Sequence, residues 1–128
     1  MDLLYKEATE NTPFVSFNFK KGLFILEGQC TLDEPESFFT SIENHIKDYI
    51  KQPAECTILT LNLSAINISS SKFLLNIVVL LDELYQLNKD VKISGYIITM
   101  KMEIMSLEMI MLIWSQFLSN SLKLYKIL

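Results

Sequence analysis

The sequence predicts a single α/β domain built on one mixed sheet, because extended apolar runs alternate with helical apolar patterns along most of the chain. Two extended runs come first and are separated by a short turn. Each later run is divided from the next by a helical segment, which favours parallel pairing through right-handed connections. The expected order is β-β-α-β-α-β-α-β, an α/β sandwich. A chain of 128 residues has the size of one domain, so we assign residues 1–128 to a single unit.

The first two strands are predicted to form a hairpin. They cover residues 14–19 and 23–28, and Lys20-Lys21-Gly22 provides the turn between them. In the first strand Val15, Phe17 and Phe19 share one face, which is expected to face the core.

The first helix is expected to begin at Asp33-Glu34-Pro35, because proline and acidic residues are favoured in a first helical turn. Gln52-Pro53 should end it. Its apolar face is formed by residues at helical spacing, namely Phe38, Ile42, Ile46, Tyr49 and Ile50.

The next strand has apolar or threonine side chains on both faces, which is typical of a central strand covered by helices. The long apolar run that follows the serine cluster is too long for a strand, so it predicts a second helix. The remaining elements are expected in this order: strand 56–63, helix 73–85 ending near 87–88, strand 91–98, a third helix over 102–118 and a short strand over 122–128.

Charge and hydropathy exclude two classes of partner. All basic residues are lysines and the net charge is −4, without a basic cluster, so we expect no nucleic-acid binding. The longest uncharged stretch, 109–122, is shorter than the ~20 residues of a membrane span, so we expect no membrane insertion. The first residues are interrupted by charges and lack the apolar centre of a signal peptide. A cytoplasmic protein is expected.

Residues that carry enzyme chemistry are few. Cys30 and Cys56 are not in a Cys-x-x-Cys arrangement, and two free, partly buried thiols are expected rather than a disulfide. The single histidine, His45, is displaced from the apolar stripe of the first helix and has only Asp48 nearby, so a surface or boundary position is expected. The three glycines form no phosphate-binding loop. We therefore expect no catalysis, no cofactor and no metal.

The segment that could carry a function is Asn67-Ile68-Ser69-Ser70-Ser71-Lys72, between a buried strand and a long helix. A helix N-terminus leaves up to four N–H groups unpaired, and a serine N-cap there contributes about 0.5–2 kcal/mol. Capping accounts for one serine but less easily for three, because serine is a mediocre helix former beyond the cap. The residues alone favour a cap over a phosphorylation site.

A phosphorylated serine in this segment would gain roughly −1.5 to −2 charges. The helix dipole would tolerate that charge, with a favourable contribution of about 0.3–1 kcal/mol, and Lys72 is close in sequence. Such a phosphate is expected to alter what docks at this surface rather than to unfold the domain.

Several short motifs resemble the SiaC family of bacterial regulatory phosphoproteins. The most specific one is the run 67–75, Asn-Ile-Ser-Ser-Ser-Lys-Phe-Leu-Leu, where the family pattern is close to Asn-Thr-Ser-Ser-Ser-Lys followed by an apolar helix. The weaker ones are Thr12-Pro13, Gly22, Glu27-Gly28-Gln29 and Phe38-Phe39. The likeness extends over about residues 7–98.

The resemblance implies a STAS-like fold, similar to anti-sigma-factor antagonists, which agrees with the element order above. It also implies a threonine that a dedicated kinase phosphorylates and a PP2C-type phosphatase dephosphorylates. The unmodified form would bind and activate a diguanylate cyclase, which links the switch to cyclic-di-GMP and biofilm formation. The implied partner-binding residues are Asn67, Ile68, Ser69, Ser70, Ser71 and Lys72.

The chain departs from this family in two places. Ile68 occupies the position of the phosphorylated threonine and has no hydroxyl, so the acceptor either moves to Ser69 or is lost. The Met-rich part from residue 100 to 114 has little family likeness, as a diverged paralogue or a disrupted reading frame would each produce. The alternative function is therefore an interaction module without a switch, which acts by constitutive partner binding or self-association, with the Met-rich helix as core or as an adaptable docking surface.

Overall fold

Three antiparallel strands form the N-terminal part of the computed structural model, which describes residues 2–97 and 123–124. They are β1 (Leu3–Lys6), β2 (Phe14–Asn18) and β3 (Leu23–Cys30). The predicted hairpin is confirmed, because β2 and β3 pair antiparallel around the turn at Gly22. The sequence did not predict β1, which pairs antiparallel with β2 and has only four residues in which an alternation could appear.

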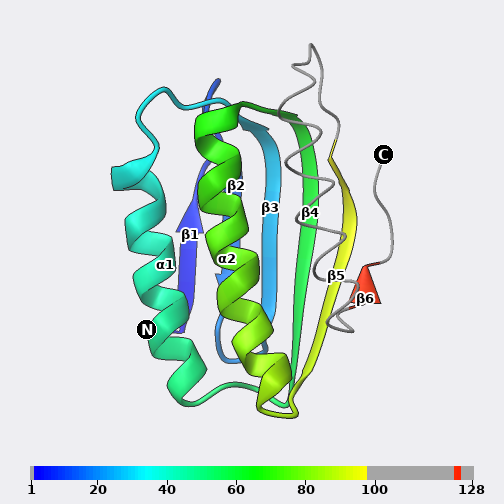
Figure 1. Cartoon of the computed structure of the whole chain (residues 1–128). Helices are drawn as coiled ribbons and strands as arrows, with labels where there is room; N and C mark the ends of the chain where they lie inside the picture. Colours follow the sequence, from blue (N-terminus) through cyan, green and yellow to red (C-terminus); the bar gives the residue numbers. More distant parts are fainter. Residues whose placement is uncertain (1, 98–122, 125–128) are drawn as a thin grey trace.

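The rest of the sheet is parallel. The chain continues through α1 (Glu36–Lys51), β4 (Cys56–Ile66), α2 (Ile68–Gln86), β5 (Asp90–Ile97) and β6 (Lys123–Leu124). The six strands follow the order β1-β2-β3-β4-β5-β6, with parallel pairs from β3 onward, so the sheet is mixed as predicted (Figure 1). The third helix predicted over 102–118 lies outside the described residues. Of the last predicted strand, 122–128, only the two residues of β6 are described.

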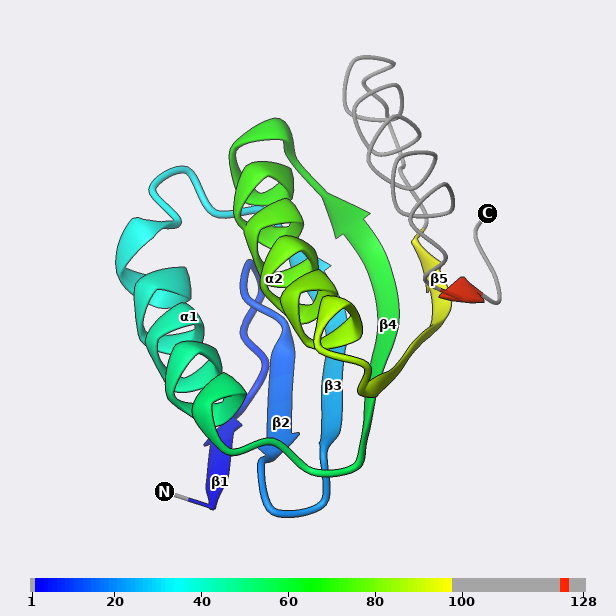
Figure 2. The same cartoon turned by 60° about the horizontal axis from the view of Figure 1, so that its bottom comes forward.

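Both described helices pack on the same face of the sheet (Figures 1 and 2). The side chains of β4 alternate between a buried row that faces α1 and α2 and a half-buried row on the opposite face. The prediction that helices cover both faces of this strand is therefore not met by α1 and α2. On the face of β4 that points away from α1 and α2, Ile58 and Thr60 are half-buried, and neither of these two helices covers them.

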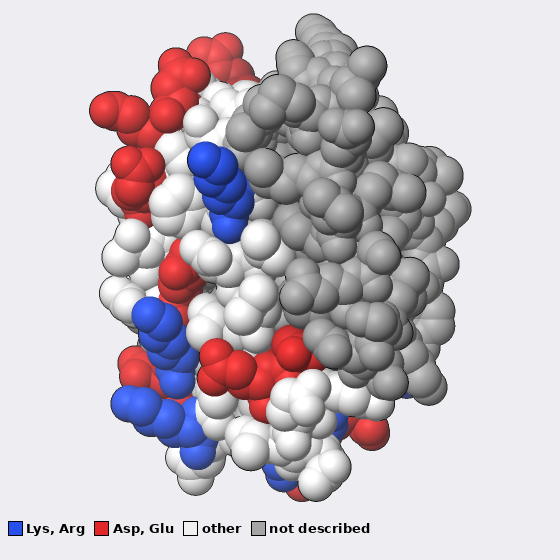
Figure 3. Space-filling view, in the orientation of Figure 1, with Lys and Arg blue, Asp and Glu red and all other residues white. Residues whose placement is uncertain are grey.

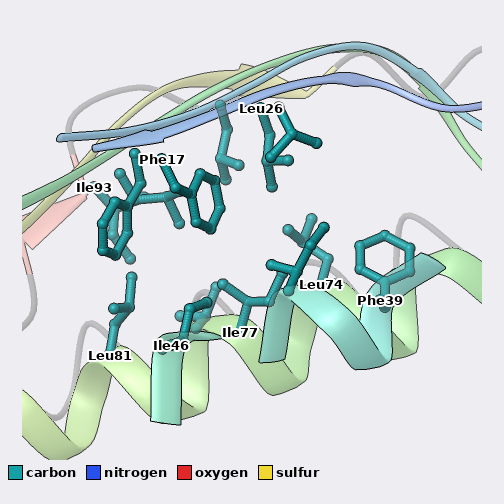
Figure 4. Close-up of a cluster of buried hydrophobic side chains, with 14 of the residues drawn as sticks. Phe17, Leu26, Phe39, Ile46, Leu74, Ile77, Leu81 and Ile93 are labelled. Atoms are coloured by element: carbon teal, nitrogen blue, oxygen red, sulfur yellow. The ribbon is translucent and has the colours of Figure 1, made fainter. Parts of the chain in front are cut away.

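The core lies between the helices and the sheet (Figure 4). Phe17 and Phe24, on neighbouring strands, stack with their ring centroids 4.6 Å apart. The predicted apolar face of α1 is confirmed at Ile42, Ile46 and Tyr49, whereas Phe39 rather than Phe38 is the deeply buried aromatic. Each fully buried side chain of this size contributes about 1.5–3 kcal/mol of transfer free energy. The largest fully buried side chains include Phe17, Phe24, Phe39, Leu26, Ile42, Ile46, Leu59, Leu61, Leu63, Ile77, Leu81 and Leu84.

Gly22 connects the hairpin to the parallel part of the sheet. Its φ of +72° is a left-handed conformation, and a Cβ there would lie 2.3 Å from the carbonyl oxygen of Cys56. The close approach lets the Gly22 carbonyl accept a hydrogen bond of 2.8 Å from the Ile58 N–H. Glycine is therefore required by both the backbone angle and the space.

Candidate functional site

The residue that caps α2 is Asn67, not one of the three serines. Asn67 has an extended backbone, and its Oδ1 accepts a hydrogen bond of 2.9 Å from the Ser70 N–H. The prediction of a serine N-cap is therefore wrong. Asparagine is as good an N-cap as serine, and an N-cap side chain accepts from the backbone N–H two or three residues later. The capping bond therefore uses the backbone N–H of Ser70 and leaves the Ser70 hydroxyl for other contacts.

Asn67 also fastens α2 to the connector between β3 and α1. Its Nδ2 donates to the Leu32 carbonyl at 2.9 Å, and its backbone N–H donates to the Cys30 carbonyl at 3.1 Å. The Ser70 hydroxyl accepts from the Leu32 N–H at 3.3 Å. The start of α2 and the connector are thus held together by hydrogen bonds of two side chains, from residues that lie more than 30 positions apart in sequence.

The three consecutive serines have different environments. Ser70 and Ser71 are 0% and 1% exposed, whereas Ser69 is exposed on the outer side of the first turn of α2. Lys72, one position after the cluster, is also exposed. Successive residues of a helix point about 100° apart, so a run of three serines must divide between the buried and the exposed side. A kinase could reach only the hydroxyl of Ser69 among these three.

The buried side of this junction contains the Cys30 thiol. Burial raises the pKa of Cys30 to about 11, and a hydrogen bond with the Ser70 hydroxyl acts in the opposite direction. Cys30 and the half-buried Cys56 are both free thiols. Because the thiolate is the reactive form of cysteine, a raised pKa and burial make Cys30 chemically inert near neutral pH.

The charges around the junction are unevenly distributed. The first turn of α2 contains no acidic residue, so no side chain there neutralises the positive end of the helix dipole. The connector and the start of α1 carry three exposed acids, Asp33, Glu34 and Glu36. Figure 3 shows acidic side chains gathered over this end of the molecule. Negative charge added to the exposed side of the first α2 turn would therefore meet a favourable dipole and an acidic neighbourhood.

Aromatic rings connect the two helices close to this junction. Phe73 of α2 stacks on Phe39 of α1 with ring centroids 5.5 Å apart and planes 14° apart. Phe38 packs edge-on against Phe39. The ammonium group of Lys6, in β1, lies over the ring of Phe38, 5.6 Å from its centre. These contacts fix the first turns of both helices relative to each other and to β1, so the molecular surface at the start of α2 has a defined shape.

His45 lies at a boundary position, as expected, toward the other end of α1. Its Nδ1 donates to the Ser41 carbonyl at 2.7 Å, and its ring stacks on Phe19. It borders an open hollow of about 510 Å³ whose rim includes Lys20 and Asp48. Within residues 2–97 and 123–124, no three His, Cys, Asp or Glu side chains are grouped to hold a metal ion. In the same part of the chain, no helix combines the length and hydropathy needed to span a membrane.

The hydrogen bonds between the connector and α2 could not be predicted from the sequence. Asn67 could have been identified as the cap from its residue type and its spacing to Ser70, since asparagine is among the best N-caps. No local pattern indicates that Leu32 supplies a carbonyl and an N–H to residues 35 and 38 positions later. That contact depends on how β3, β4 and the helices are arranged.

The fold is that of solved SiaC structures. The crystal structure of apo-SiaC from Pseudomonas aeruginosa covers 99% of this chain and 98% of its own, with 19% identity and a TM-score of 0.78. A second SiaC structure from P. aeruginosa aligns over the full length of both chains with 18% identity and a TM-score of 0.78. The structure of the P. aeruginosa diguanylate cyclase SiaD in complex with its activator SiaC gives 18% identity and a TM-score of 0.76, over 97% of this chain and 98% of that one. No curated protein matches the chain in sequence.

A sequence model described as "SiaC family regulatory phosphoprotein" matches residues 6–112. The match continues beyond residue 98, into the Met-rich part where the sequence had shown little family likeness. It includes the connector, the first turn of α2 and both helices that form the junction. The chain therefore belongs to the SiaC family of regulatory phosphoproteins.

Proposed function

We propose that the chain is a non-enzymatic regulator that binds a diguanylate cyclase through the first turn of α2. The predicted segment 67–72 forms the proposed surface through its exposed residues Ser69 and Lys72, with the acidic connector beside them, whereas Ser70 and Ser71 are buried beneath it. The SiaC of P. aeruginosa is the activator of the diguanylate cyclase SiaD and forms a complex with it. Membership of the same family supports a cyclase as the partner of this chain in cyclic-di-GMP signalling.

We further propose that Ser69 is the phosphorylation site of this chain. The observation that carries this proposal is its exposure, because Ser70 and Ser71 are buried and Ile68 has no hydroxyl. A kinase would add the phosphate and a PP2C-type phosphatase would remove it. The helix dipole and Lys72, three positions later in α2, support a phosphate at this place.

The phosphate would act on partner binding by charge. It adds roughly −1.5 to −2 charges to a surface that already carries Asp33, Glu34 and Glu36. A cyclase that binds the unmodified surface would have to desolvate this charge, and burial of an unpaired charge is costly. The unmodified form would therefore be the binding form, and phosphorylation would release the partner.

A second candidate is a module that binds its partner without regulation by phosphate. Ile68 favours it, because isoleucine stands where the resemblance to the family implies a phosphorylated threonine. In that case Ser69 would be only the first exposed residue of a capped helix. The two candidates agree on the binding surface and differ only in whether Ser69 is modified.

Mapping of phosphosites by mass spectrometry, on the protein purified from its native cells, separates these candidates. Phosphate at Ser69 supports the switch, and its absence under all growth conditions leaves constitutive binding. The effect on binding is measured with a diguanylate cyclase of the same genome, using the protein with Ser69→Asp and Ser69→Ala. Ser69→Asp should weaken the complex at least ten-fold, and Ser69→Ala should leave it within about two-fold.

Gln86→Glu provides a matched control for the added negative charge, because Gln86 is exposed at the far end of α2. It should not alter binding. Equal binding by the Ser69→Asp and Ser69→Ala proteins would refute the proposed switch. Absence of binding to any cyclase of that genome would refute the proposed partner.

A further inference from the structure

In the described part of the chain, the sheet face opposite α1 and α2 carries a group of apolar side chains among polar ones. Side chains that alternate with the core residues of β1, β3 and β4 point to this face. The strand register places Leu3, Asn18, Leu23 and Ile58 in one row across the sheet, and Tyr5, Ser16, Ile25 and Thr60 in the next row. Apolar side chains of β1 and β3 thus lie on both sides of the polar residues of β2 in each row. Leu3, Tyr5 and Leu23 are 50%, 53% and 43% exposed, which places them among the most exposed large apolar side chains of the described residues.

The two ends of this surface carry opposite charges. The β2–β3 turn, with exposed Lys20 and Lys21, lies beyond the row of Leu23. Exposed Glu27 lies two residues beyond Ile25 at the other end. Glu7 lies at that same end, where its Oε1 accepts a hydrogen bond of 3.0 Å from the Tyr5 hydroxyl. The two rows thus lie between a basic end and an acidic end.

This arrangement is complementary to itself. A two-fold axis that crosses the strands between these two rows turns the row of Leu23 onto the row of Ile25 in a second copy. The same rotation reverses the direction of the strands, so the lysine turn of each copy lies opposite Glu27 of the other. One symmetry operation therefore satisfies both the apolar and the charged part of the surface, as an isologous interface requires.

We infer that the far face of the sheet is the contact surface of a face-to-face dimer with a second copy of this chain. The inference does not depend on the proposed cyclase binding, which uses the first turn of α2. Four strands about 4.8 Å apart, over some seven residues of about 3.3 Å each, give a patch of roughly 400 Å². Stable interfaces bury about 800 Å² on each partner, so this dimer is weak and depends on concentration.

Sedimentation velocity over a range of protein concentrations tests this inference on the full chain. The weight-average mass of the unmodified protein should rise from that of a monomer toward that of a dimer, and added salt should weaken this rise. Leu23→Lys should abolish the rise. Glu27→Lys and Lys21→Glu should each weaken the dimer about ten-fold, and the protein with both changes should regain it, because the two charges exchange places across the axis.

Val79→Lys is the matched control, because Val79 is 45% exposed on the outer side of α2, on the opposite face of the molecule. It should leave the dimer unchanged, and circular dichroism should show that all variants are folded. A monomer at every concentration would overturn the inference. A dimer that Leu23→Lys leaves intact, or that Val79→Lys dissociates, would overturn it equally, because it would use another surface.

Discussion

Replacement of Asn67 by alanine tests the central structural element of the site. Asn67 accepts from the Ser70 N–H and donates to the Leu32 carbonyl, both at 2.9 Å. Alanine can do neither, and it leaves the Leu32 carbonyl without this donor in a half-buried place. The substitution should therefore weaken both the start of α2 and its contact with the connector.

The expected loss of stability follows from these two bonds. Loss of an N-cap side chain costs about 0.5–2 kcal/mol. Loss of the second, half-buried hydrogen bond adds about 0.5–1.5 kcal/mol. The sum is about 1–3.5 kcal/mol in the free energy of unfolding, which corresponds to a decrease of roughly 5–12 °C in the melting temperature of a domain of this size.

Urea unfolding followed by far-UV circular dichroism measures this loss. Asn76→Ala is the control, because Asn76 is an exposed asparagine in the middle of the same helix, where alanine is the better helix former. It should be neutral or slightly stabilising. Asn67→Asp should fall between the two, because aspartate keeps the cap acceptor but lacks the donor for the Leu32 carbonyl.

Equal stability of the Asn67→Ala and Asn76→Ala proteins would refute the reasoning. It would mean that water replaces both hydrogen bonds without cost, and that the connector is not held by α2. A loss as large with Asn67→Asp as with Asn67→Ala would show that the bond to Leu32 accounts for the whole effect.

Four further experiments have expected outcomes. Ser70→Ala should cost about 1–3 kcal/mol in urea unfolding, because it removes the acceptor of a part-buried N–H, whereas Ser69→Ala at an exposed position should change stability by less than about 0.5 kcal/mol. The Cys30 thiol, with its pKa raised to about 11, should react with a thiol reagent only after unfolding, while half-buried Cys56 reacts first. Since the unfolded thiol loses its proton near pH 9, stability should fall by about 2 kcal/mol between pH 9 and 11 relative to a Cys30→Ala protein, and a parallel pH dependence of the two proteins would contradict this. Gly22→Ala should destabilise by about 2 kcal/mol or more, measured as a lower urea midpoint, since it combines a left-handed backbone with a Cβ 2.3 Å from a carbonyl oxygen.

Most of the fold could be predicted from local patterns. The hairpin, both described helices and the parallel strands follow from apolar periodicity and from turn residues such as Gly22 and Pro53, which are local signals. The strand β1 could not be predicted, because its four residues are too few to show an alternation of apolar and polar side chains and because it is held by its pairing with β2. The difference between the two faces of β4, of which α1 and α2 cover one, could not be predicted either, since an apolar pattern shows that a side chain avoids water and does not show which element covers it.

The candidate site could be located from the sequence but not resolved into roles. Three equal serines between a strand and a helix indicate a helix start. Which of them is buried depends on the phase of the helix relative to the sheet, and the phase is set by tertiary packing of residues such as Phe73 and Leu74. The cap itself was assigned to the wrong residue type, because serine and asparagine are almost equally favourable N-caps.

The environment of the serines limits how a phosphorylation switch could work in this chain. Ser70 is fixed by Leu32 and Cys30 and cannot accept a phosphate without loss of the junction. An acceptor at Ser69 instead of position 68 lies about 100° further around the helix axis and about 1.5 Å along it. A kinase that reads this helix end, and a phosphatase that opposes it, would have to approach from a different side than for a threonine at position 68. Recognition by the modifying enzymes would then diverge together with the acceptor, while the proposed cyclase surface would stay in place.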